Sequence, residues 1–357
     1  MTRRPDYVFT HNFNPVTAVC FGVVNTKDYL ISGDEKGILM IWDLVTFKRV
    51  NMVSNAHDKR INKVWFNEDS RARDDTGNAI ALISQARDEI KIWTVDRQLN
   101  PISLTLSMCL QASLMSMSTF SAITTNPVKD DEKSSIMLAT SDPFKQSCVQ
   151  VIRIGENYVR MSLSPKDSAK LGIIVVIKCI KLMNGCSVVL VAYESGNLML
   201  FSIEDENSRT MSTECCSIKP FEDMITCMDY DPMSGKGACG SSINQLKVFT
   251  IRTEEPSLRL ELLSQIELPV DGISAIEIRK DSSTMCIATW DQRVRIFSFK
   301  TLEQLTVIDY HKSSINCINF ANRVNRLGKF FFAISSNDKI ISLWSLHSED
   351  KEPISNV

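Results

Sequence analysis

The sequence predicts an all-β protein in which seven similar four-stranded blades form a closed ring, a β-propeller. The first observation is an apolar strand ending that recurs about every fifty residues. The second is that each copy sits in the same succession of segments: an alternating apolar run, a strand ending in small residues, a turn, the recurring strand and a more polar strand. A period of this length indicates units that bury their faces against one another, and four strands per unit is typical of a propeller blade. The central residues of the seven copies are Trp42, Trp93, Ile152, Phe201, Phe249, Phe297 and Trp344.

Blade one shows this order of segments. Residues 16–21 form the alternating apolar run, and residues 29–33 form the strand that ends in small residues. Asp34 stands in the turn, and residues 41–44 (IWDL) form the recurring strand. Several short strands at regular spacing with turn residues between them indicate β-structure.

The last blade lacks an outer strand of its own. The recurring strand of blade seven ends at Leu346, and the polar tail 348–357 follows. An open blade would expose a sheet edge. Residues 6–13 are extended, alternate in polarity and precede blade one. We therefore predict that 6–13 supplies the outer strand of the last blade, within a single propeller spanning residues 1–347.

Three charged segments interrupt the regular spacing. They are residues 67–78, 126–135 and 204–214. Their composition predicts solvated loops, which would also suit phosphorylation or partner contacts.

Composition excludes several classes of protein. The net charge is −2 with both signs interspersed, whereas a dedicated nucleic-acid binder usually shows a basic face. The 11 cysteines contain no CxxC pair and no zinc-type spacing, which predicts a reduced, intracellular protein. No segment resembles a signal peptide or a membrane span. We expect no bound metal or cofactor, and no direct contact with nucleic acid or membrane.

Catalysis needs reactive groups that converge with a base in reach. The chain has four histidines, and no nucleophile elbow, phosphate-binding loop or metalloprotease motif occurs. We therefore predict a protein that is not an enzyme.

The repeats resemble the WD40 family over essentially the whole chain. Trp42–Asp43 is the literal WD dipeptide, and degenerate copies of it begin at Trp93 and Trp344, where Thr and Ser replace the Asp. The resemblance implies that a blade-opening histidine, a turn acid and the strand tryptophan are linked by hydrogen bonds within a blade. The residues that match these structural positions are His57 and His311 for the histidine, and Asp88, Asp291 and Asp338 for the acid.

The turn between the second and third strands of a blade opens onto one face, beside the central channel. The residue before the turn acid is Arg87 in blade two, Tyr193 in blade four and Trp290 in blade six. Arg60, which precedes the first strand of blade two, is expected on the same rim. Tyr, Trp and Arg are frequent anchors at interfaces. These four residues form a hypothetical partner-binding face. The alternative is that Tyr193 and Trp290 pack against neighbouring blades.

The later blades carry a finer resemblance. The segments 189–201, 287–297 and 338–346 are similar to the family of guanine nucleotide-binding protein β-subunit-like protein 1 and its fungal counterpart, ASTRA-associated protein 1. No heptad precedes blade one, which argues against a G-protein β subunit paired with a γ chain. The resemblance implies a scaffold in the maturation of phosphatidylinositol 3-kinase-related kinases. Its expected partners are co-chaperone subunits and these large kinases, with the propeller a monomer inside a larger complex in cytoplasm and nucleus.

A second function class stays open. A propeller can also recognise peptides at its channel mouth, as a histone reader or as a substrate receptor of a ubiquitin ligase. Readers of modified lysine often surround the cation with aromatic rings. The turn positions supply only Tyr193 and Trp290, which favours the scaffold. The run 290–293 (WDQR) matches a ligase-docking pattern in letters but stands at a different place in the blade.

Overall fold

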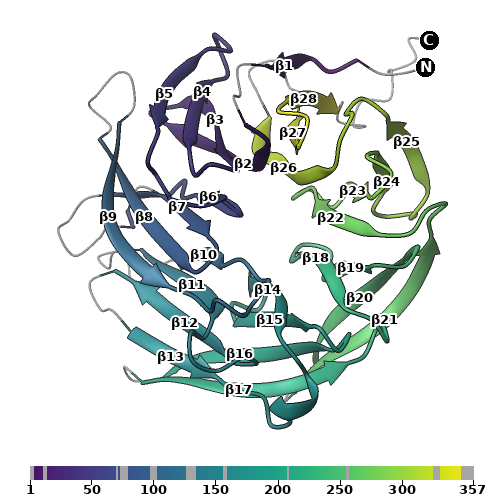
Figure 1. Cartoon of the computed structure of the whole chain (residues 1–357). Helices are drawn as coiled ribbons and strands as arrows, with labels where there is room; N and C mark the ends of the chain where they lie inside the picture. Colours follow the sequence, from purple (N-terminus) through teal and green to yellow (C-terminus); the bar gives the residue numbers. More distant parts are fainter. Residues whose placement is uncertain are drawn as a thin grey trace, which may run out of the picture.

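Seven antiparallel sheets of four strands each surround a central channel, as the sequence predicts (Figure 1). The computed structural model describes residues 4–10, 14–69, 71–72, 79–96, 103–125, 134–155, 159–206, 209–254, 257–324 and 330–346. Within each of blades one to six the four strands follow one another in chain order from the channel outward. Hairpin connections of this kind let each blade form from a local stretch of sequence.

Blade one consists of β2 (Val16–Val24), β3 (Lys27–Asp34), β4 (Leu39–Asp43) and β5 (Arg49–Val53), and blade two of β6 (Lys63–Phe66), β7 (Ile80–Ala86), β8 (Glu89–Asp96) and β9 (Ser103–Gln111). Blade three consists of β10 (Ser121–Thr125), β11 (Ser135–Ser141), β12 (Val149–Ile154) and β13 (Val159–Leu163). Blade four consists of β14 (Ile174–Lys181), β15 (Ser187–Tyr193), β16 (Leu198–Glu206) and β17 (Arg209–Ile218). A short 3-10 helix, η1 (Ser168–Lys170), connects blades three and four.

Blade five consists of β18 (Ile225–Asp231), β19 (Lys236–Ser241), β20 (Gln245–Glu254) and β21 (Ser257–Glu267). Blade six consists of β22 (Ile273–Ile278), β23 (Thr284–Thr289), β24 (Val294–Ser298) and β25 (Gln304–Ile308). The first three strands of blade seven are β26 (Ile315–Val324), β27 (Phe330–Ser336) and β28 (Ile341–Leu346). The fourth strand of blade seven is β1 (Tyr7–Phe9), from the other end of the chain.

The ring closes through this N-terminal strand, which confirms the predicted closure. β1 pairs antiparallel with β28, so that Val8 lies opposite Ser342, and the Asp6 N–H donates to the Leu343 carbonyl at 2.8 Å. The side chain of Phe9 is buried against Trp42 of blade one, with ring centroids 5.1 Å apart. β1 therefore joins blade seven to blade one. The strand is shorter than the predicted 6–13, and residues 11–13 and the predicted tail lie outside the described residues.

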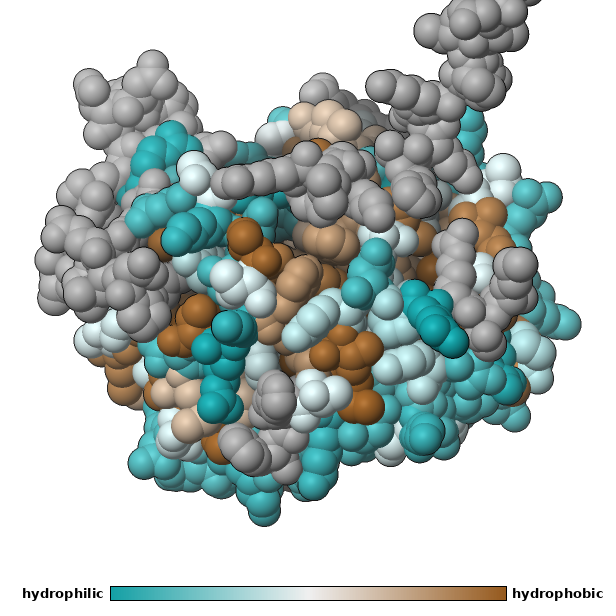
Figure 2. Space-filling model, turned by 90° about the horizontal axis from the view of Figure 1, so that it is seen from above, coloured by the Kyte–Doolittle hydropathy of each residue, from teal (hydrophilic) through white to brown (hydrophobic). Residues whose placement is uncertain are grey.

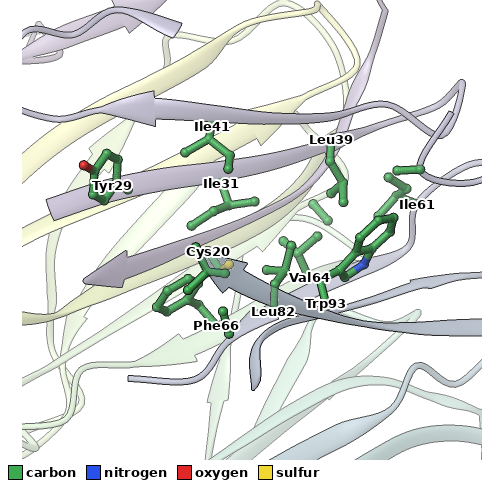
Figure 3. Packing of buried hydrophobic residues seen from close by; sticks show 14 of the residues in the cluster. Cys20, Tyr29, Ile31, Leu39, Ile41, Ile61, Val64, Phe66, Leu82 and Trp93 are labelled. Atoms are coloured by element: carbon green, nitrogen blue, oxygen red, sulfur yellow. The ribbon is translucent and has the colours of Figure 1, made fainter. Parts of the chain in front are cut away.

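Both faces of each sheet are covered by the neighbouring blades, so the core lies between blades. In Figure 3, Cys20, Ile31 and Ile41 of blade one face Phe66 and Leu82 of blade two. Gly22 in β2 permits this approach, since a Cβ there would lie 2.6 Å from the Phe66 ring. The buried strands consequently read as nearly continuous apolar runs, such as the fully buried β7.

The antiparallel order divides the connections between two faces of the ring. The turns between second and third strands and the connections from blade to blade lie on one face, which we term the upper face. The turns between first and second strands, and between third and fourth strands, lie on the opposite, lower face. Gly272 and Trp290 illustrate the rule, because the Trp290 N–H in a β23–β24 turn donates to the carbonyl of Gly272 in a blade-to-blade connection.

One predicted loop is a strand pair. Residues 204–214 were expected to form a solvated loop, but β16 and β17 continue through most of this range, with Glu204 opposite Met211 and Glu206 opposite Arg209. That prediction was wrong because polar side chains do not prevent two neighbouring antiparallel strands from extending their ladder. Most of the predicted loops 67–78 and 126–135 lies outside the described residues.

In the described part of the chain, no helix has the length and apolar character needed to cross a bilayer.

Candidate protein-docking face

Arg60 and Arg87 are exposed on the upper face, where the sequence places them. The Arg60 guanidinium donates to Asn316 Oδ1 at 3.1 Å, and Asn316 in turn donates to the Val16 carbonyl. This chain of hydrogen bonds holds Arg60 beside the junction of blades one and seven. Arg87 stands in the β7–β8 turn with a φ of 53°, and its carbonyl accepts from Gln85 Nε2 at 2.8 Å. Both arginines are exposed to solvent.

Trp290 is exposed on the same face, on the other side of the ring. Its side chain is 58% exposed, an unusual fraction for the largest apolar side chain. The indole lies directly over Gly272, where a Cβ would approach a ring atom to 2.0 Å. The glycine thus provides the surface on which the ring rests, and one face of the indole is left for a partner.

Tyr193 does not belong to this face, and its assignment there is corrected. The side chain is fully buried, and its hydroxyl donates to the Ser147 carbonyl of blade three at 3.0 Å. Burial raises the pKa of this phenol well above its usual range. The residue ends β15, whose side chains pack between blades, so the alternative of inter-blade packing is the one observed.

The histidines act within the blade architecture. In blade seven, His311 Nδ1 lies 2.9 Å from Asp338 Oδ2, and Ser342 Oγ joins His311 Nε2 to Trp344 Nε1. Although burial alone would raise the pKa of Asp338, hydrogen bonds from His311 and from backbone N–H groups hold it below the ordinary value.

Blade two has the same network with a different acid. His57 Nδ1 lies 2.9 Å from Glu89 Oε2, and Ser84 Oγ joins His57 Nε2 to Trp93 Nε1. The expectation that Asp88 pairs with His57 was wrong. Asp88 instead lies 3.5 Å from the ammonium group of Lys59.

The remaining structural positions have other partners. Trp42 Nε1 donates to Ser32 Oγ at 3.0 Å, and Asp43 Oδ1 accepts from the N–H of Val45 at 2.7 Å in the turn that follows. Asp291 forms a two-point ion pair with the buried guanidinium of Arg295, and this pairing holds its pKa at about 2 although burial alone would raise it. Asp291 therefore stabilises its turn through an arginine and not through a histidine.

Charged residues line the channel from the first strands of several blades. Lys178 of β14 forms an ion pair with Asp229 of β18, and Asn319 of β26 donates to Glu277 of β22 at 3.1 Å. Burial, followed by the charge of Asp229, raises the pKa of Glu277 to about 7. Lys63 of β6 faces the same network. Together with the hydrogen bond from the Ile278 N–H to Asp229 Oδ2 at 2.7 Å, these contacts link the innermost strands of blades four to seven.

The upper face also carries an apolar cluster that the sequence reasoning missed. Leu114, Met115 and Met117 lie in the connection from β9 to β10, and Phe144 lies in the β11–β12 turn. All four side chains are exposed. The signal was present in the residues 113–118 (SLMSMS), where serines alternate with large apolar residues outside any strand. These residues were not predicted because they do not stand at the positions before the turn acids.

Single exposed apolar residues need no special explanation. Figure 2 views the ring edge-on and shows apolar residues among polar ones on that side. Two small cavities between strands, next to Phe66 and next to Met161, hold about 10 Å³ each, room for about one water molecule. Among the described residues no group of three or more His, Cys, Asp or Glu side chains could hold a metal ion. The exposed Arg60, Arg87 and Trp290 and the apolar cluster all lie on the upper face.

Comparisons with known proteins agree with the resemblance read from the sequence. No family model matches the chain. It is 25% identical over 321 residues to mouse guanine nucleotide-binding protein subunit beta-like protein 1, covering 89% of this chain and 87% of the mouse protein. It is 24% identical to ASTRA-associated protein 1 of Schizosaccharomyces pombe, covering 96% and 99% of the two chains.

The fold is also found in solved structures. The crystal structure of the β-propeller domain of Cps50 (Swd1) from Myceliophteria thermophila matches with a TM-score of 0.66 at 16% identity, covering 95% of this chain and all of that one. An identity this low shows the fold alone. The chain is therefore a seven-bladed β-propeller that is similar along most of its length to guanine nucleotide-binding protein subunit beta-like protein 1 and ASTRA-associated protein 1.

Proposed function

We propose that this protein is a non-enzymatic scaffold in an ASTRA-type co-chaperone complex that supports the maturation of phosphatidylinositol 3-kinase-related kinases. The observation that carries the proposal is the match to ASTRA-associated protein 1 over 96% of this chain and 99% of the fission-yeast protein. Because the two chains match end to end, the propeller itself is the part that the two proteins share. A link to chromatin and residence in both nucleus and cytoplasm belong to the same proposal.

The ring suits such a role physically. A closed β-ring is preorganised, so that little conformational entropy is lost when a partner docks. Large clients expose apolar surface before they assemble and are prone to aggregate. A rigid scaffold that holds client and co-chaperone together raises their effective concentration. The upper face offers Arg60, Arg87 and Trp290 at separate positions around the rim, which allows more than one partner to bind.

The peptide-reader alternative has less support. A cage for a modified lysine needs several aromatic rings around one cation. Tyr193 is buried and unavailable for such a cage, which leaves Trp290 as the aromatic residue at the predicted positions.

The test is affinity purification of the tagged full-length protein followed by mass spectrometry. Wild type is compared with Arg87→Ala/Trp290→Ala, and with Met183→Ala/Met233→Ala as the control on the lower face. We expect wild type and control to recover co-chaperone subunits and the large kinases, and the first variant to recover less of them. Recovery of histones or a ligase adaptor in their place would overturn the proposal.

A further inference from the structure

The outer strand of blade four, β17, is interrupted where two cysteines follow each other in the sequence. In a regular strand, neighbouring side chains point to opposite faces of the sheet. Leu200 of β16 lies opposite Cys216, whereas the next residue of β16, Phe201, lies opposite Glu214. Cys215 is therefore the extra residue of a β-bulge, an irregularity that re-aims side chains relative to the regular alternation.

The bulge turns both thiols to the same face of the sheet. Cys215 and Cys216 pack against the apolar core between blades four and five, to which Leu200 also belongs. Phe201 belongs to the core on the other face, between blades three and four. The carboxylate of Glu214, the residue before the pair, accepts from the N–H of Lys166 at 2.8 Å in the connection that leaves blade three. The two sulfur atoms thus share one face without that carboxylate.

The two thiols are accessible and lie close enough to interact. Both side chains are partly exposed, so a small ligand in solvent can reach them. Burial raises the pKa of the Cys216 thiol, and the charge of Cys215 adds to this, whereas a backbone hydrogen bond from Leu260 of β21 opposes it. An effect of one thiol on the other requires a short separation, because Coulomb interactions weaken with distance.

A disulfide between these two residues is unfavourable. Consecutive Cα atoms are about 3.8 Å apart across a trans peptide, whereas the two Cα atoms of a disulfide are normally about 4.4–6.8 Å apart. The raised pKa of Cys216 also disfavours the thiolate, which is the form that attacks oxidants and disulfides. We therefore expect the pair to persist as two thiols.

Two thiols on one face provide ligands for a soft metal ion. Thiolates select Cu(I), Zn²⁺ or iron–sulfur clusters. Structural zinc sites use four protein ligands, and iron–sulfur clusters are also held by four. Within the part of the chain that the structure describes, no group of three or more His, Cys, Asp or Glu side chains is placed to hold a metal ion. Cu(I) is the ion that remains, because two thiolates complete its linear coordination.

We propose that Cys215 and Cys216 bind one Cu(I) ion on the outer strand of blade four. Two S–H protons pass to solvent and two Cu–S bonds form, and no electron is transferred because the copper enters and stays as Cu(I). Both ligands belong to one strand, so binding requires no movement of one blade against another. The inference is independent of the proposed scaffold function. The zinc-type spacings considered for the sequence do not cover two adjacent cysteines.

The test is an anaerobic titration of the reduced full-length protein with Cu(I) held by the chromophoric chelator bicinchoninate. Cys215→Ala/Cys216→Ala removes both ligands, and alanine avoids placing an unsatisfied hydroxyl against the apolar core. Cys109→Ala/Cys186→Ala is the matched control, because it removes two exposed cysteines that lie in different blades. Circular dichroism and thermal unfolding confirm that the variants fold.

We expect wild type and the control to withdraw one equivalent of Cu(I) from the chelator that Cys215→Ala/Cys216→Ala does not withdraw. Each single variant, Cys215→Ala or Cys216→Ala, should bind this ion at least about 100-fold more weakly, since the second ligand of a chelate acts at a high effective concentration. X-ray absorption at the copper edge should show two sulfur ligands in wild type.

Several outcomes would overturn the inference. They are a wild type that takes no Cu(I) from the chelator, equal uptake by the two double variants, and a single variant that binds as tightly as wild type. Tight binding of Zn²⁺ that Cys215→Ala/Cys216→Ala abolishes would also overturn it, because it would reveal further ligands. If the affinity purification recovers no ASTRA-type partner while Cu(I) binds as expected, the proposed complex fails and the copper site stands.

Discussion

Glu89 Oε2 lies 2.9 Å from Nδ1 of His57, so the acid that completes the hydrogen-bond network of blade two stands one residue after the turn position that Asp88 occupies. Ser84 Oγ receives the Trp93 indole N–H at 2.8 Å on the other side of the imidazole. Burial lowers the pKa of His57, although the hydrogen bond to Glu89 opposes this. The four side chains hold the β7–β8 hairpin to the connection that enters the blade.

The first prediction separates the two acids. Glu89→Ala removes the partner of a buried imidazole and is expected to lower the free energy of unfolding by about 1–2 kcal/mol. Asp88→Ala removes a long ion pair at the surface and should change it by less than about 0.5 kcal/mol. Urea unfolding followed by circular dichroism measures both values. Equal losses would mean that the network does not depend on Glu89.

The fold could be predicted because its signals are repeated. The recurring aromatic strand endings and the alternating runs are set by burial between blades, and the same burial recurs in every unit. Closure by the N-terminal segment followed from the missing outer strand of blade seven. Which acid reaches His57 could not be predicted, since Asp88 and Glu89 differ by one residue and by one methylene, and only the turn geometry decides between them.

The candidate site was less accessible to sequence reasoning. Tyr193 and Trp290 occupy equivalent positions before a turn, yet one is buried and the other exposed. The difference lies in neighbours distant in the sequence. The Ser147 carbonyl offers Tyr193 an acceptor between blades, whereas Trp290 rests on Gly272 at the surface. The blade-three cluster was missed because its residues lie outside every repeated position.

A second prediction concerns the pH dependence of stability through the channel. The pKa of Glu277 is raised above its unfolded-state value by burial and by the charge of Asp229, while Lys178, Lys63 and Lys280 oppose this. The folded protein therefore holds the proton more tightly, and the stability that this provides is lost as pH rises through about 7. Glu277→Gln mimics the protonated group. The free energy of unfolding of Glu277→Gln, measured relative to that of wild type, should therefore increase as pH rises from about 5 to 8.

Urea unfolding at several pH values provides the measurement for Glu277→Gln. Glu303→Gln is a suitable control, because Glu303 is exposed beside β25 and its substitution should leave the pH profile unchanged. A constant difference between Glu277→Gln and wild type across this range would show that Glu277 does not titrate there.

A third prediction uses two glycines with similar backbone angles. Gly272 and Gly185 have φ values of 82° and 87°, so alanine is strained at both. A Cβ at Gly185 meets nothing within 4 Å, whereas a Cβ at Gly272 enters the Trp290 ring. Gly185→Ala should cost about 1 kcal/mol of stability, which is the strain alone. Gly272→Ala should cost at least as much and also displace the indole, seen as a shift of the Trp290 Nε1–H resonance that Gly185→Ala does not produce.

The last prediction tests how strongly β1 holds the ring together. The Phe9 ring is buried between Tyr7 and Trp42, with centroid distances of 4.9 and 5.1 Å, so it contacts both the closing strand and blade one. Phe9→Ala should lower the free energy of unfolding by about 3–5 kcal/mol, because it leaves a cavity at the junction of the chain ends. Phe144→Ala removes an equal ring that is 90% exposed and should cost less than about 0.5 kcal/mol. Deletion of residues 1–12 removes the ladder as well as the ring and exposes the edge of β28, so it should destabilise the propeller more than Phe9→Ala and promote aggregation. Thermal unfolding and light scattering measure both effects, and a truncated protein as stable and monomeric as wild type would contradict the role of β1 in closing the ring.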